Sequence, residues 1–469
     1  AAGATKAFAS SQSTTTAAVG NGVTITAGDL VLYANGNDDN LASASPGAGG
    51  LVGIASAEAD TEANVKSEAK IGNGAQITLV KNAGTGATGT LQALANQNTF
   101  ADLKIQTNAY GLISGAGSEG RNDVNAESIV RFGDGANVTA HNISANAANR
   151  FTKADTGTNV NGEAAGAVTV AGAAIRTDLS MDTLVVVENN VTLTAKDDTT
   201  AGGNISLSTF NDLFYHDSVA YKGGGALSGI GASSTLDTID DGDEDDEEGN
   251  KLVGKVQIGT NPDSLTDSNV KLYATGDIRL AANSEVDATI RVSVDNYGFA
   301  TVSVAQSRLQ VNPQHHIVLA NGAELKALRH VRMLASMDEN FNRDTYNLAA
   351  YSDTFAGSVI PIDKVVQDSL LFITNRINVM NGAEVLSGGN VDLLADTYAL
   401  ANIISQGKSR NWASALSDAI DSALGGSETF TSNGNSAADS VVTVDGEIHT
   451  GINRFVNVVT STRSPASTA

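Results

Sequence analysis

"ANGAELKALRHVRMLASMD", residues 320–338, is one of several loose copies of the same phrase along the chain. Related copies are "IGNGAQITLV" at 71–80, "FGDGANVTAHNISANA" at 132–147 and "VMNGAEVLSGGNVDLLAD" at 379–396. Further copies lie at 20–34, 187–207 and 269–281, and a weaker one begins at Val442. Self-similarity of this kind indicates a stacked repeat architecture rather than a single globular core.

Each copy reads as strand, turn, strand. In the copy at 320–338, Gly322 supplies a positive φ for a tight turn. Because strand side chains alternate between faces, two outward pairs are expected, Glu324 with Lys326 and Arg332 with Leu334. The inward set is Ala323, Leu325, Ala327, Val331, Met333 and Ala335. A second turn is expected at Leu328–Arg329, where other copies have Gly28–Asp29, Gly276–Asp277 and Gly389–Asn390. We interpret Arg329, His330 and Arg332 as outward-facing surface residues rather than catalytic groups.

Asparagine recurs at the first turn of the repeat. Asn21, Asn73, Asn321 and Asn381 occupy one position, and Asp134 replaces them once. Side-chain amides at such corners hydrogen-bond turn backbone, so we expect an architectural role.

The runs between the copies alternate small apolar and polar residues, which favours extended strands over helices. One such run places Ala55, Ala57, Ala59, Ala63, Val65, Ala69 and Ile71 on one face. Another does so for Val286, Ala288, Ile290, Val292 and Val294, with Ala300, Val302 and Val304 continuing after a turn at 296–298. We expect these runs to form the third side of each coil or a sheet leaning against it.

The composition agrees with a narrow, layered interior. The chain has 469 residues with 48 Gly, only 5 Pro, 5% aromatic residues and no Cys. A net charge of −24 argues against nucleic-acid binding, because phosphate contacts need Lys and Arg. The absence of Cys excludes disulfides and thiolate metal sites and fits passage through an oxidising periplasm. No apolar stretch is long enough for a membrane span.

We therefore predict an all-β solenoid of parallel strands over residues 1–469, as a single elongated domain. At roughly 20–30 residues per coil it would have roughly 15–20 coils and be on the order of 70–100 Å long. Residues 237–251 would form an acidic insertion loop. Residues 411–425 would form a short amphipathic helix, with Asn411 as N-cap and an apolar stripe of Trp412, Leu416, Ile420 and Leu424.

The repeat phrases "GNGAQI…GTLQALA", "NGAELKALRHVRMLA" and "NGAEVLSGGNVDLLA" resemble those of the giant filamentous adhesins of Gram-negative bacteria. These include the filamentous haemagglutinins and, more closely, the leukotoxin-type filamentous adhesins. The resemblance implies a right-handed parallel β-helix that is exported through the outer membrane by a dedicated partner pore. It also implies a surface-bound or released fibre acting in adhesion and biofilm formation.

The acidic run "TIDDGDEDDEEGNK" at 238–251 is the one candidate metal site. Calcium prefers several oxygen ligands, and the candidates are Asp240, Asp241, Asp243, Asp245 and Asp246. The spacing does not match the helix–loop–helix calcium motif, and a solvated, self-repelling loop is the competing interpretation. No other cofactor is expected.

The histidines give weaker signals. They are His141, His216, His315, His316, His330 and His449. The adjacent pair at 315–316 would need a third ligand to hold a metal, and no HxH or HExxH spacing accompanies it. Structural or surface roles are expected for all six.

The sequence favours a non-enzymatic function: an extracellular, secreted segment of a bacterial surface adhesin or fibre. The expected partners are other copies of the chain, flanking repeats of a longer precursor, and host, matrix or cell-surface ligands. One alternative is a self-assembling filament subunit processed from that precursor. The other is a polysaccharide-active β-helix enzyme, but no carboxylate pair is singled out by its spacing, and Trp412 is the only Trp available to a sugar-binding groove.

Overall fold

The computed structural model describes residues 1–82, 84–154, 159–197, 202–238, 252–260, 268–396, 400–411, 427–451, 454–461 and 467–468. Regular structure in these ranges is entirely β, which confirms the predicted class, and they contain no helix. The helix expected over 411–425 falls outside the described residues except at Asn411. That residue, the expected N-cap, instead ends strand β22.

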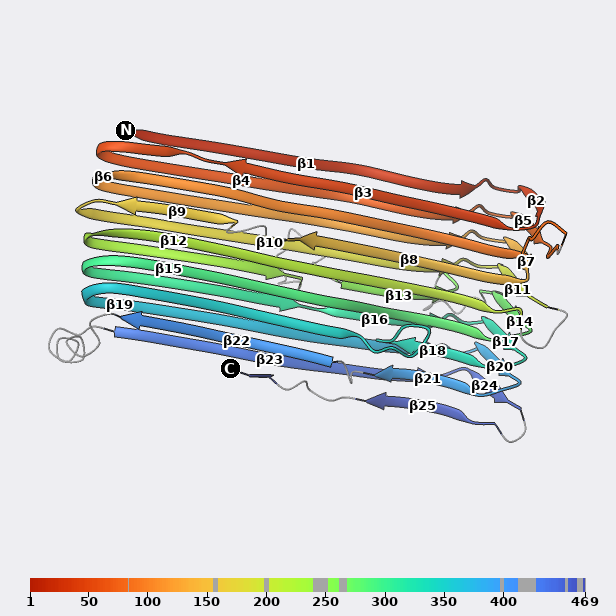
Figure 1. Ribbon diagram of the computed structural model, residues 1–469. Helices are drawn as coiled ribbons and strands as arrows, with labels where there is room; N and C mark the ends of the chain where they lie inside the picture. Colours follow the sequence, from red (N-terminus) through yellow and green to blue (C-terminus); the bar gives the residue numbers. More distant parts are fainter. Residues whose placement is uncertain are drawn as a thin grey trace.

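Two kinds of strand build the molecule (Figure 1). One parallel sheet is made of four-residue strands: β2 (Thr24–Ala27), β5 (Gln76–Leu79), β7 (Asn137–Ala140), β11 (Thr192–Ala195), β14 (Lys271–Ala274), β17 (Glu324–Ala327), β20 (Glu384–Ser387) and β24 (Glu447–Thr450). The remaining strands belong to the other sheet: β1 (Ala2–Val19), β3 (Leu30–Ala44), β4 (Gly47–Ile71), β6 (Thr90–Phe132), β8 (Asn142–Lys153), β9 (Val160–Ala165), β10 (Val168–Val187), β12 (Ile205–Asp237), β13 (Leu252–Ile258), β15 (Ile278–Val311), β16 (Pro313–Leu319), β18 (Val331–Ala335), β19 (Thr345–Val379), β21 (Val391–Asp396), β22 (Leu400–Asn411), β23 (Ser427–Val444), β25 (Val456–Ser461) and β26 (Ser467–Thr468).

The chain runs in wide coils. A short strand is followed by a corner, a long run, a bend at the far end, and a second long run that returns to the next short strand (Figure 1). Every named strand pairs in parallel with an equivalent strand of a neighbouring coil, so the expectation of stacked parallel coils agrees with the pairing. The long runs form two faces of the coil, and the short strands close the third.

The expected coil size is wrong. Val19 pairs with Ile71, which lies 52 residues further on, and Val187 is equivalent to Ile258, which lies 71 residues further on. The eight short strands therefore mark eight levels, about 38 Å high at about 4.8 Å per level. The predicted height of 70–100 Å is correspondingly wrong. Alternation of apolar and polar residues shows which side chains face inward, but it does not show where a long strand ends and the chain bends. The long runs were therefore divided into too many coils.

The inward columns are confirmed. In the copy at 320–338, the six residues expected inside are at most 2% exposed, and the same holds for the run from Ala55 to Ile71. Small and β-branched side chains suit this interior because the two long faces lie back to back along most of the coil. The first-turn prediction is also confirmed where Asn21 Oδ1 accepts a hydrogen bond from the Asn73 amide at 2.9 Å.

One orientation was wrongly predicted, and one outward residue is not exposed. Leu334 points outward as predicted but is fully buried, because Met337 and the loop that follows it cover this patch. After the far bend of β15, Thr301, Ser303 and Ala305 face inward, whereas Val302 is 44% exposed. Alternation is interrupted in the bend, since Asn296 and then Thr301 face the interior, and every residue beyond it changes face.

Both ends of the stack are open in the part of the chain that the structure describes. β1 pairs only with β4, β2 only with β5 and β3 only with β6. At the opposite end β24 pairs only with β20, and β25 only with β21. Rows of backbone donors and acceptors therefore face outward at each end.

Candidate functional site

A ladder of side chains runs up the corner between the short strands and the first long face. At six of the seven steps, all but that from Thr90 to Asn142, a corner side chain accepts a hydrogen bond from the backbone amide of the equivalent residue one coil later. The amide-to-acceptor pairs are Thr90 to Asp29, Asn204 to Asn142, Asp277 to Asn204, His330 to Asp277, Asn390 to His330 and Phe455 to Asn390, at 2.8 to 3.3 Å. The ladder fixes the vertical register of the coils where strand pairing is interrupted by the turn.

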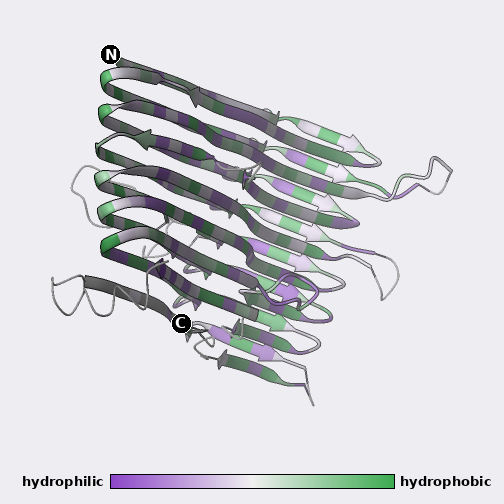
Figure 2. Ribbon diagram, turned by 60° about the vertical axis from the view of Figure 1, so that its left-hand side comes forward, coloured by the Kyte–Doolittle hydropathy of each residue, from purple (hydrophilic) through white to green (hydrophobic). Residues whose placement is uncertain are grey.

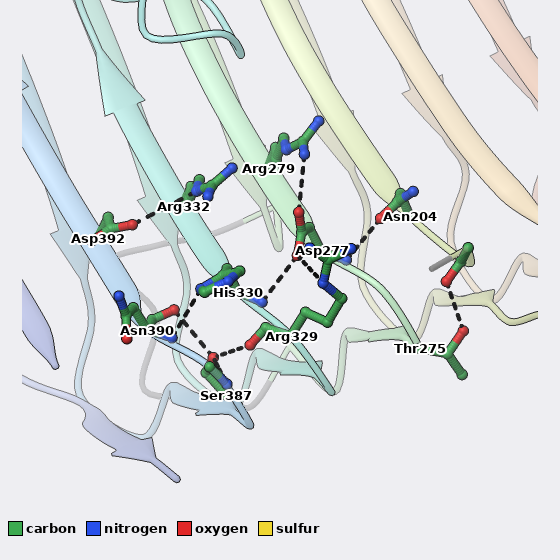
Figure 3. A network of polar contacts seen from close by, with 12 residues as sticks. Asn204, Thr275, Asp277, Arg279, Arg329, His330, Arg332, Ser387, Asn390 and Asp392 are labelled. Carbon is green, nitrogen blue, oxygen red and sulfur yellow. Dashed lines mark hydrogen bonds and ion pairs between the residues drawn. The ribbon is translucent and has the colours of Figure 1, made fainter. Parts of the chain in front are cut away.

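Asp277 is the most connected residue of this ladder (Figure 3). It is 2% exposed, and it accepts hydrogen bonds from the His330 amide at 3.1 Å and from Arg279 at 2.9 Å. The Arg329 guanidinium lies 3.7 Å away. Burial alone would raise the pKa of Asp277, but the His330 amide and the Arg329 and Arg279 charges lower it overall. The carboxylate is therefore charged and held in place.

His330 and its neighbours extend the network by one coil (Figure 3). The His330 Nδ1 atom accepts from the Asn390 amide at 3.0 Å, which requires that this nitrogen carry no proton. The Ser387 hydroxyl donates to the Arg329 carbonyl at 2.6 Å, and Arg332 lies 3.7 Å from Asp392. The interpretation of Arg329, His330 and Arg332 as surface residues was thus incomplete, because they connect successive coils.

The predicted calcium ligands Asp240, Asp241, Asp243, Asp245 and Asp246 lie outside the described residues. Calcium binding there stays a prediction, and melting temperatures measured with and without Ca²⁺ test it.

The histidine pair at 315–316 cannot hold one metal ion between its two rings. His315 faces the interior and is fully buried, whereas His316 points to the outer face of β16. Successive strand residues project to opposite faces, so the two imidazoles diverge. Of the others, His141 Nδ1 lies 3.6 Å from Asp197 and His216 Nε2 lies 3.5 Å from Asp287.

A row of carboxylates lies on the outer face of the short sheet. Glu324, Glu384 and Glu447 are equivalent residues on three successive strands. Glu384, Glu447 and His449 each bring one potential ligand atom within 4.8 Å of the others. Tyr273 donates its hydroxyl to Glu324 at 3.0 Å, and burial together with Glu324 and Glu384 raises its pKa to about 12. Glu447 and His449 are exposed, so hydration competes with any cation held there.

Sequence reasoning missed a charged cluster inside the coils. Lys153 Nζ lies 2.7 Å from Asp217 Oδ1, and both side chains are fully buried. Ser234 donates to the second oxygen of Asp217, and the Tyr215 ring lies 5.2 Å from the ammonium. Burial would lower the pKa of Lys153, but Asp217 raises it well above its ordinary value. The missed signal was parity: Lys153 follows Phe151 at an inward position.

A second interior cluster surrounds His315. Its Nδ1 atom lies 2.7 Å from Asn375 Oδ1 and its Nε2 atom 3.2 Å from Asp344 Oδ2. Burial lowers the pKa of His315 to about 4 and raises that of Asp344 to about 7. Between about pH 4 and 7 both groups are therefore mainly uncharged. Tyr346 and Ser336 donate to Asp344.

A polar depression of about 470 Å³ lies on the outer surface beneath the loop at 336–344. Its carboxylates are Glu285, Asp338, Glu339 and Asp344. Asp338 accepts hydrogen bonds from two amides of its own loop, and Glu339 accepts one from Ser206. Glu339 thus ties the loop to the sheet, Asp338 stabilises the loop's own turn, and Asp344 accepts hydrogen bonds from Ser336 and Tyr346.

No family model, curated protein or solved structure matches this chain. Among the described residues, no helix has the length and apolar character needed to cross a membrane.

Proposed function

We propose that this chain is a right-handed β-solenoid segment of a bacterial surface adhesin or extracellular fibre. It would act through its stacked faces rather than through a catalytic centre. One observation carries the proposal: the strands pair in register from the first level to the last, and the outer edges of both end levels are unpaired in the described part. Such a stack accepts a further coil at either end.

The same open edges favour a second candidate, a subunit that assembles end to end. Flanking repeats of a longer precursor would cover the edges in the first case, and further copies of the chain would cover them in the second. Head-to-tail stacking is a heterologous contact and produces an open filament.

Adhesion and catalysis are separated by one assay. Beads coated with the purified chain should attach to matrix-coated surfaces or to one another and release no product from acidic polysaccharides. Product release, or coated beads that attach no better than uncoated ones, would contradict the adhesin proposal.

Filament assembly is tested at the edge of β1. The carbonyls of Ala1 and Val19 accept hydrogen bonds from the second coil, so the backbone groups of the even-numbered residues between them face the open edge. A Ser10→Pro/Thr14→Pro variant therefore removes donors that an added strand would need without breaking the pairing with β4.

Electron microscopy then decides between the two candidates. Filaments formed by the parent chain and by Ser10→Ala/Thr14→Ala, but not by the proline variant, would support a self-assembling subunit. Single stacks at every concentration of the parent chain would reject the subunit and leave the segment of a longer chain.

A further inference from the structure

The far bends of the coils form an exposed apolar strip. Figure 2 shows this as hydrophobic bends stacked one above another at the edge opposite the short strands. Its members, between 40% and 75% exposed, are Leu51, Val52, Ile54, Leu112, Ile113, Val168, Val170, Leu227, Phe299, Val302 and Ile362. They come from six successive coils and together expose apolar area on the order of several hundred Å², the size at which patches mark interaction sites.

One column within this strip alternates large residues with glycine over its first five levels and ends on two large residues. Strand pairing places six residues in vertical order: Ile54, Gly115, Val170, Gly229, Val302 and Ile362. The neighbouring column is apolar at every level: Val52, Ile113, Val168, Leu227, Ala300 and Ile360. The first column is therefore a row of projections with holes at Gly115 and Gly229, and Val302 and Ile362 adjoin without a hole.

The fold itself does not require these glycines. A Cβ atom added to Gly229 would meet no atom within 4 Å, and one added to Gly115 would meet nothing closer than 3.8 Å. Neither residue has a positive φ. Glycine inside a strand weakens it and marks places where another backbone approaches closely. The holes thus point to something outside the coil.

We propose that this strip binds the same strip of a second copy of the chain, with the two stacks running in opposite directions. A two-fold axis parallel to the strands, midway between the levels of Val170 and Gly229, reverses the order of the column. Val170 then faces Gly229 of the second copy, and Gly115 faces its Val302. At these four inner levels each valine faces a glycine, and at the two end levels Ile54 faces Ile362 of the second copy. The contact is the same on both copies, as an isologous contact requires.

The adjacent column repeats this complementarity. Gly117, Gly172, Gly231 and Val304 lie in it at successive levels and line an open depression of about 620 Å³. In the reversed arrangement Val304 of the second copy enters the depression opposite Gly117. A parallel arrangement in register would instead set valine against valine and glycine against glycine.

Charges set the extent of the contact. Lys364 of one copy lies opposite Ser56 of the other, one outward column from Glu58, which is itself paired with Lys6. One column further along the strands, Arg121 would face Arg308 of the second copy. That repulsion confines the contact to the strip and its glycine depression.

Filling a hole gives the first test, by sedimentation and light scattering. The parent chain should reach a mass twice its 47.8 kDa as concentration rises. Gly229→Val should shift the dissociation constant at least tenfold toward monomer while leaving circular dichroism and melting temperature intact. Ala349→Val, at a half-exposed outward position on the other long face, is the matched control and should dimerise like the parent.

Cross-linking gives the register, because the chain contains no Cys. With a short bis-maleimide reagent, which adds to one thiol at each end, a mixture of Ile54→Cys and Ile362→Cys chains should form the mixed dimer. Ile54→Cys alone should not cross-link, since its copies would be five levels apart, about 24 Å. Cross-linking of Ile54→Cys to itself, or a dimer unaffected by Gly229→Val, would overturn the proposal. So would a monomer at all concentrations, whether or not that monomer binds phosphatidylcholine vesicles through the strip.

Discussion

Breaking the buried Lys153–Asp217 pair should cost more than removing any surface ion pair of this protein. Lys153→Met keeps most of the side-chain volume but leaves Asp217 fully buried, with only the Ser234 hydroxyl hydrogen-bonded to it among the contacts described above. Removing one partner of a buried pair typically costs about 3–5 kcal/mol, against about 0–1 kcal/mol for an exposed pair. Asp217→Leu should cost a similar amount, because it leaves a buried ammonium beside the Tyr215 ring.

The double variant separates the pair's interaction from its desolvation cost. Lys153→Met/Asp217→Leu removes both charges and should return to within about 1 kcal/mol of the parent, because an apolar pair avoids the desolvation cost. Denaturant unfolding at neutral pH measures all four chains. Single variants that each lose less than about 1 kcal/mol, or a double variant that loses their sum, would refute the buried pair.

The other predictions concern pH and the corner ladder. Burial raises the pKa of Asp344 to about 7, so its contribution to the free energy of unfolding is full at low pH and falls as pH rises from about 4 to 7. Burial lowers the pKa of His315 to about 4, so its contribution rises with pH between about 4 and 6.5. These two pH effects nearly cancel in the parent chain. In Asp344→Asn only the His315 effect remains, so the free energy of unfolding should fall by on the order of 3 kcal/mol between pH 6.5 and 4, at about 1.4 kcal/mol per pH unit. A free energy of unfolding that does not change with pH in denaturant titrations would contradict this pairing. Asp277→Ala should lower the free energy of unfolding by about 2 kcal/mol, because it removes an acceptor for the His330 amide and a partner for Arg279. Asp277→Asn, which keeps an acceptor, should lose less in the same titration, and equal losses would show that the amide contact contributes nothing.

The sequence was sufficient for the parts of the fold that repeat locally. The phrase around Leu325 and Met333 predicts a turn, a short strand and an inward column, and both residues are fully buried. This works because turn chemistry and face alternation are properties of a few adjacent residues. The same reasoning placed a polar group at the second corner, where Asp277 and His330 form the ladder.

Features that depend on distant parts of the chain were not predicted. Nothing local fixes where a strand of more than twenty residues bends, so the coil length was underestimated and Val302 was given the wrong face. The burial of Leu334 depends on the loop beyond Met337. Interior pairs such as Lys153 with Asp217 join residues 64 positions apart, and only the stacking of coils brings them together.

Removing one whole coil tests the stacked architecture most directly. Leu319 and Val379 are equivalent residues of adjacent levels, so deleting 320–379 joins Leu319 to Met380 and leaves every remaining column in register. Deleting 320–349 instead removes about half a coil and so breaks the register of the strands on all three faces. The account predicts that the whole-coil deletion stays soluble, keeps its β-strand circular dichroism and unfolds cooperatively, whereas the half-coil deletion does not. If the whole-coil deletion is as unfolded as the half-coil deletion, that result would contradict a fold in which every coil pairs with its neighbours through equivalent strands.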